Sequence, residues 1–204
     1  MAAATFFHDA AKKRAAEAVK IVEARTAAEI VIVVRRHSGT YRATDLTAGA
    51  VAAIVMLAFL WFSPIAFAPA MISINVVLTF AITALVCANV GPLRRVLSGK
   101  RCREHAELAA KAAFVDLGIS KTQGRTGILV FVSMFERTAV LVHDVGVDRS
   151  AIEGFSVVET AITAAVRSTN FDAFISAVES FGQTLETALP RSADDVNELP
   201  DEVA

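Results

Sequence analysis

The amino-acid sequence predicts a mixed α/β fold that is interrupted by a transmembrane helical hairpin. From Leu46 to Leu93 the chain has no Asp, Glu, Lys, Arg or His, and this span can hold two membrane helices of about 20 residues each. Short β-branched runs at 29–34, 128–133 and 138–143 have the composition of buried strands. Apolar residues at helical spacing surround these runs, and buried strands between helices indicate an α/β sandwich.

The composition points the same way. The chain has 204 residues, of which 54% are hydrophobic, and its mean hydropathy is +0.52. These values are high for a water-soluble protein. The net charge of −1 and the lack of a basic face with aromatic platforms argue against a nucleic-acid partner. Cys87 and Cys102 are isolated and form no disulfide or zinc pattern. We expect no cleavable signal, because charges interrupt the first 20 residues.

The first predicted element is a helix at 6–27, followed by a strand at Glu29–Val34 that is buried on both faces. The apolar face of the helix comprises Phe7, Ala11, Ala15, Ala18, Val19 and Val22.

The uncharged span is predicted to form two transmembrane helices at about 45–63 and 70–91. Pro64 and Pro69 break the helix between them. Basic residues flank the span on both sides: Arg35, Arg36, Arg42, Arg94, Arg95, Lys100, Arg101 and Arg103. The positive-inside rule then predicts a two-pass protein of the plasma (inner) membrane, with both termini in the cytoplasm and the lipid bilayer as a partner.

After the span, a helix is predicted at about 101–117, with Leu108, Ala112 and Val115 among its apolar positions and Gly118 after its end. The strands at 128–133 and 138–143 should pair antiparallel, because the link between them is too short for a crossover helix.

Two further helices are predicted at about 149–167 and 171–188, and Pro190 stops the second. A hairpin returns the chain to the side it left, so residues 1–44 and 94–190 can form one discontinuous α/β domain around the insert at 45–93. We expect the acidic tail, 191–204, to be mobile.

Three segments resemble the TPM domain family: "RTAAEIVIVV", "RTGILVFVSMFERTAVLVHDVGVD" and "NFDAFISAVESFGQTLETALP". The same family includes thylakoid-lumen proteins of photosystem repair. The resemblance implies a three-layer α/β/α sandwich. Family members have been described as acid phosphatases, as calcium binders and as assembly or repair factors. Where the family has an acidic "DNG"-like step before the hairpin, this chain reads "TQGRTG".

The best candidates for metal ligands follow the predicted strand at 138–143, at the end of the β-hairpin. Asp144 and Asp148, with His143 beside them and Glu136 or Asp116 from elsewhere, could hold Ca²⁺ or Mg²⁺ for phosphate hydrolysis. The alternative interpretation is a strand end, in which Asp144 turns the chain and Asp148 caps the next helix. No glycine-rich phosphate loop and no nucleophile elbow is present.

Two functional hypotheses follow. The first is a membrane-anchored interaction or assembly factor with a cytoplasmic TPM-like domain and a membrane or cytoplasmic protein as partner. The second is a phosphatase that depends on Ca²⁺ or Mg²⁺ and uses the carboxylates around Asp144 and Asp148.

Overall fold

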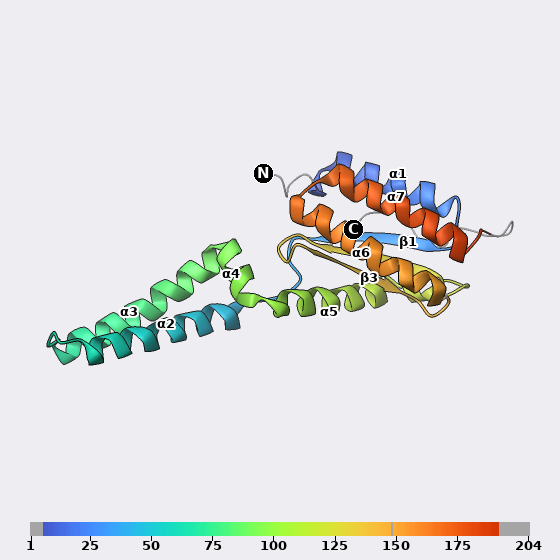
Figure 1. Cartoon of the computed structure of the whole chain (residues 1–204). Coiled ribbons are helices and arrows are strands. Elements are labelled where there is room, and N and C mark those ends of the chain that lie inside the picture. The colour runs from blue at the N-terminus through green and yellow to red at the C-terminus, as the bar shows by residue number, and fades with distance from the viewer. Residues whose placement is uncertain (1–5, 148, 192–204) are drawn as a thin grey trace. The chain divides into compact units, whose positions relative to one another are not determined.

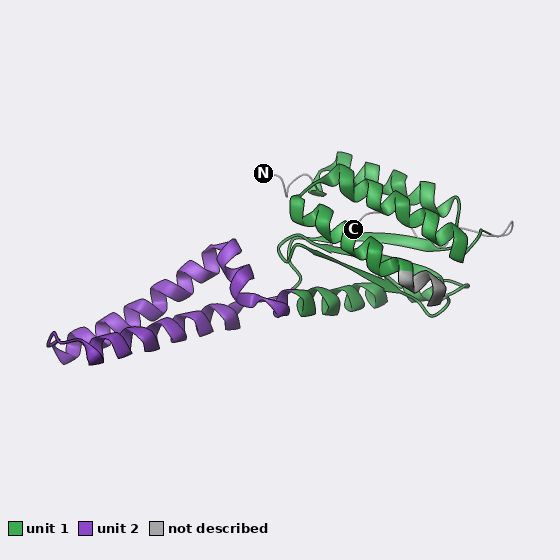
Figure 2. Cartoon of the chain, in the orientation of Figure 1, with its two compact units in different colours: residues 1–38, 103–204 green, residues 39–102 purple. Residues whose placement is uncertain are grey.

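The computed structural model describes residues 6–147 and 149–191, and the side chains of all of these except 149–153. The described part forms seven α-helices, a short 3₁₀ helix and three strands (Figure 1). The chain divides into two compact units, one of residues 1–38 and 103–204 and one of residues 39–102 (Figure 2). The second unit therefore extends further at both ends than the predicted insert at 45–93. The predicted mobile tail lies outside the described residues from 192 onward.

The sheet contains β1 (Glu29–Arg35), β2 (Gly127–Ser133) and β3 (Thr138–His143) in that order. β1 and β2 are parallel, with Glu29 opposite Gly127. β2 and β3 are antiparallel, which confirms the predicted β-hairpin. Parallel neighbours need a long crossover, and here the chain between β1 and β2 includes the whole helical-hairpin unit.

One face of the sheet packs on α1 (Asp9–Glu23), α6 (Arg149–Ser168) and α7 (Phe171–Ala188). The strands contribute alternate residues to this core, as expected for a pleated sheet: Ile30, Ile32, Ile128, Val130 and Val132. The predicted apolar face of the first helix is confirmed for its five positions within α1, all of which are buried. In Figure 1, α1, α6 and α7 lie on the same side of the strands.

The other strand residues belong to a second core, which is built against α5 (Lys100–Asp116) and the 3₁₀ helix η2 (Ile119–Lys121). The helical side of this core comprises Ala106, Ala110, Ala113, Phe114 and Ile119. The predicted apolar positions of α5 are wrong, because Leu108 and Val115 are 65% and 68% exposed and Ala112 is exposed as well. Alanines and Phe114 form the side of α5 that packs on the sheet, whereas Leu108 and Val115 lie on its outer side. Gly118 follows α5 with φ +68°, the left-handed conformation expected there.

The second unit contains α2 (Arg42–Phe62), α3 (Pro69–Asn89) and a short α4 (Gly91–Ser98). α2 and α3 pack along each other as a helical hairpin (Figure 1). Gly49 allows this close approach, because a Cβ there would lie 2.8 Å from the carbonyl oxygen of Phe80. The prediction did not include α4, since Gly91–Pro92 reads as a helix end. Proline is tolerated there because it lies in the first turn of α4.

Candidate functional site

Asp144 follows β3 and is buried, with only 4% of its surface exposed. Its two carboxylate oxygens are both bound by Arg125, which precedes β2: Nε lies 2.9 Å from Oδ2 and Nη2 lies 3.1 Å from Oδ1. The amide of Val145 donates to Oδ1 at 2.7 Å. Arg125 has a positive φ of 53°, so its backbone adopts a conformation that is uncommon for a side chain of this size. The carboxylate therefore already has three internal donors.

The electrostatics of Asp144 agree with this geometry. Burial raises the pKa of the carboxyl group, but the hydrogen bonds from Arg125 and Val145 and the charges of Arg125 and His143 lower it by more. The pKa of Asp144 consequently lies below its ordinary value, and the group is an anion that the protein itself neutralises.

His143 is the last residue of β3, and its ring has two contacts within the protein. Its Nδ1 lies 3.1 Å from the carbonyl oxygen of Asp144. The ring meets that of Phe155 edge-on, with centroids 5.5 Å apart. Asp148, the other proposed carboxylate, lies outside the described residues.

Glu136 lies at the opposite end of the β-hairpin, in the turn between β2 and β3. One carboxylate oxygen accepts from the amide of Ser38 at 2.9 Å and the other accepts from the hydroxyl of Ser133. The six residues of β3 separate Glu136 from Asp144, a span of roughly 20 Å for an extended strand. The structure therefore does not bring these two candidates together.

Asp116 is the other carboxylate proposed from elsewhere in the chain. It lies at the end of α5 and lines a shallow cavity of about 200 Å³ with Arg35, His37 and Ser38, next to Phe131 of the sheet. Within the described residues, no group of three or more His, Cys, Asp or Glu side chains is placed to hold a metal ion. Of the proposed calcium or magnesium ligands that the structure describes, Asp144 is bound by Arg125.

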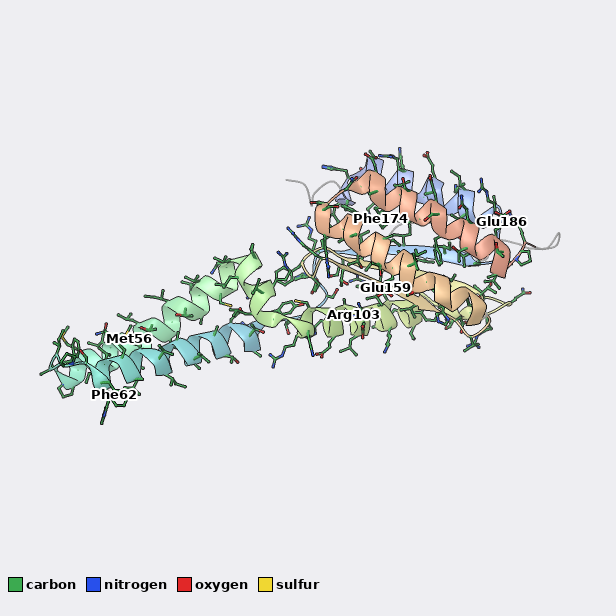
Figure 3. All side chains as sticks on the ribbon, in the orientation of Figure 1. Met56, Phe62, Arg103, Glu159, Phe174 and Glu186 are labelled. Atoms are coloured by element: carbon green, nitrogen blue, oxygen red, sulfur yellow. The ribbon has the colours of Figure 1, made fainter. Side chains whose placement is uncertain are left out.

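The basic residues around the hairpin have different roles in the structure. Arg94 binds Asp45 within the second unit, with Nε 2.9 Å from Oδ1. Arg103 belongs to the α/β unit, where it binds Glu107 of its own helix and Glu159 of α6, both at 2.8 Å (Figure 3). Because α5 and α6 pack on opposite faces of the sheet, the Arg103–Glu159 ion pair connects helices from the two faces. The guanidinium of Arg36 lies 5.3 Å from the ring of Phe7.

The sequence did not reveal the role of Arg125 or of Asp45. Arg125 follows Thr122 and Gln123, the residues that stand in place of the acidic step, and nothing in its spacing shows that its partner is 19 residues further on. Asp45 reads as an ordinary charged residue before an apolar helix.

No family model matches this chain, and no curated protein sequence matches it. Among solved structures it is similar to the NMR structure of the BA42 protein from the psychrophilic bacterium Bizionia argentinensis sp. nov.. The identity is 16% and the TM-score is 0.57, over 97% of this chain and 93% of the other. At this identity the similarity concerns the fold alone: a mixed α/β arrangement with a small sheet and predominantly helical structure.

Proposed function

We propose that the chain is a two-pass protein of a bacterial plasma (inner) membrane whose TPM-like domain acts as an interaction or assembly factor in the cytoplasm. The outward-facing apolar surface of α2 and α3 carries this proposal. Both helices have 21 residues and are apolar enough to cross a membrane, and Ile54, Phe59 and Leu85 are each about 64–67% exposed. In the most apolar stretch of α3, only 6% of the residues are buried. A core helix of a soluble protein would bury this surface, whereas lipid covers it without cost.

The distribution of charge around α2 and α3 supports a cytoplasmic position for the segments before α2 and after α3. The turn between α2 and α3 carries no charge, while basic residues precede α2 and follow α3. Positive charges near membrane helices favour the cytoplasmic side.

For the α/β unit we propose the three-layer α/β/α sandwich of TPM domains. The two separate cores support it, because α1, α6 and α7 contribute to one and α5 to the other. The resemblance in the β-hairpin and in α7 supports the same family.

The site geometry favours an interaction factor over a metal-dependent phosphatase. Asp144 is bound by Arg125, and Glu136 holds Ser38 at the other end of the hairpin. A hard cation needs several free oxygen ligands at one point. By contrast, Leu108, Ala112 and Val115 are exposed at helical spacing on α5, and such a stripe is suited to a protein partner.

Cysteine labelling tests the membrane topology. In a chain with Cys87→Ala and Cys102→Ala, a single cysteine replaces Ser63 in the turn or Lys12 in α1. A membrane-impermeant maleimide added to spheroplasts should label position 63 and should reach position 12 only after lysis. A reporter after Ala204 that is active only outside the inner membrane would overturn the proposed orientation.

Two measurements test the activity. A photocrosslinker at Leu108 should form an adduct with another protein in cells, and one at Lys12 serves as the matched control. The full chain in lipid nanodiscs should not hydrolyse a generic phosphate ester with Ca²⁺ or Mg²⁺. Hydrolysis that depends on these ions and is lost in the Asp144→Asn variant would establish the phosphatase instead.

A further inference from the structure

The short helix α4 exposes apolar side chains and directs polar side chains toward the hairpin, the reverse of a surface helix in a soluble protein. Two of its polar residues contact α2 of the hairpin: Arg94 binds Asp45, and the hydroxyl of Ser98, which is buried, donates to Thr44 Oγ1 at 3.3 Å. Its apolar residues face outward. Leu93, Val96 and Leu97 are 39%, 75% and 50% exposed.

These positions form one continuous face. Leu93, Val96 and Leu97 stand at i, i+3 and i+4, and so they share one side of the helix. Val90, directly before α4, extends the same side and is 42% exposed. A helix on a water-exposed surface turns such a face inward and its charges outward. The contacts of Arg94 and Ser98 instead hold α4 in the opposite orientation.

We propose that α4 lies in the cytoplasmic interface of the bilayer, with this outward face in contact with lipid acyl chains. The inference rests on the proposed membrane function and extends it, because it places residues 90–98 in the membrane as well. Lipid is the occupant that fits, since α4 belongs to the same compact unit as α2 and α3 and continues their outward apolar surface. Interfacial helices sit in this manner, about 5–10 Å into the boundary between headgroups and acyl chains.

The end of α4 marks where the chain returns to the headgroup level. Gly99 has a positive φ of 48° and ends the helix. Lys100 and Arg101 follow and are exposed, and such residues favour the anionic headgroup region. Arg94 is excluded from this role because its guanidinium is bound to Asp45.

Tryptophan scanning of the full chain in nanodiscs tests the proposal. Trp61→Phe removes the single native tryptophan, and one tryptophan is then introduced as Val96→Trp, Lys100→Trp or Leu108→Trp. Lipids brominated near the headgroup end of the acyl chain should quench the tryptophan at position 96 at least about twofold more than the one at position 108, given the expected depth. Aqueous iodide should quench positions 100 and 108 and spare position 96. Discs that each hold one copy of the chain exclude protection by a second copy.

Each outcome has a distinct meaning. If the tryptophan at position 96 is as accessible to iodide as the one at position 108, or is protected only when a disc holds two copies, α4 does not contact lipid and the inference is overturned. The native Trp61, which is 76% exposed at the end of α2, reports separately on the hairpin in the unsubstituted chain. If brominated lipids do not quench Trp61 either, the hairpin is not in the bilayer and the proposed function fails as well.

Discussion

Asp45 and Arg94, the two charged residues that bound the uncharged span, bind each other. Arg94 Nε donates to Asp45 Oδ1 at 2.9 Å, and Nη2 donates to Oδ2. The Asp45 side chain is 7% exposed and that of Arg94 is 24% exposed. The start of α2 is thereby joined to α4, which follows α3 directly. The two charged residues that flank the uncharged span in the sequence thus form an ion pair that connects its two ends in the structure.

Replacing Arg94 should weaken the hairpin unit. In the Arg94→Gln variant the buried carboxylate of Asp45 loses its charged partner, and breaking such a pair costs on the order of 3 kcal/mol. Unfolding in detergent should be followed by fluorescence, because the only tryptophan and the only tyrosine, Trp61 and Tyr41, both lie in this unit.

Lys100→Gln is the matched control, since it removes an exposed positive charge of the same unit. The exchange variant, Asp45→Arg with Arg94→Asp, should recover part of the loss. Equal stability of the Arg94→Gln and Lys100→Gln variants would show that the pair contributes nothing.

The Arg125–Asp144 pair should determine part of the acid sensitivity of the α/β unit. The folded-state pKa of Asp144 is lowered from its ordinary value of 3.8. Its stabilising contribution is therefore present above about pH 4 and is lost as the pH falls through the lower, folded-state pKa. In the Arg125→Gln variant the buried carboxylate loses its charged partner and its folded-state pKa rises, so the loss of stability on acidification that comes from Asp144 should become smaller.

Thermal unfolding of the full chain, followed by circular dichroism from pH 2 to neutrality, measures this effect. The Asp144→Asn variant should lack this part of the pH dependence, and Lys12→Gln should resemble the unmodified chain. Superimposable pH profiles of the Arg125→Gln variant and the unmodified chain would contradict the prediction.

The elements that could be predicted from the sequence are those with a strong local pattern. The β-branched runs gave all three strands to within one residue, and the apolar spacing in 149–167 and 171–188 gave α6 and α7. The buried side of α5 was not predicted correctly because alanines lie on both sides of the helix. The spacing of apolar residues therefore does not distinguish its buried side from its exposed side. Ion pairs across 19 and 49 residues depend on tertiary packing, which local patterns do not encode.

Asn170 should stabilise α7 as its N-cap. Its side-chain oxygen accepts from the amide of Ala173 at 3.0 Å, which satisfies one of the free amides of the first turn. Asn170→Ala should lower the free energy of unfolding by about 1 kcal/mol, and Asn170→Asp should preserve it. Amide hydrogen exchange of the peptide that covers the start of α7 measures the effect locally, and equal protection in the Ala and Asp variants would argue against the cap.

Glu136 should act as a structural anchor for the loop after β1. Glu136 is 6% exposed, and its carboxylate accepts from Ser133 and from the amide of Ser38, while the Ser38 hydroxyl donates to Ser133 Oγ at 2.6 Å. Glu136→Ala leaves buried donors without an acceptor, which costs about 1–3 kcal/mol. Glu136→Gln keeps one acceptor oxygen and should lose less.

Hydrogen exchange separates this role from a catalytic one. In Glu136→Ala the amides of the peptide after β1 should exchange faster, and those of α7 should change only as far as global stability changes. In Glu136→Gln the exchange rate of these amides should lie between those of Glu136→Ala and the unmodified chain, because a side-chain amide accepts through one oxygen only. If Glu136→Ala leaves both the exchange and the stability unaltered, its hydrogen bonds do not hold the loop, and Glu136 then becomes available as a ligand-binding carboxylate.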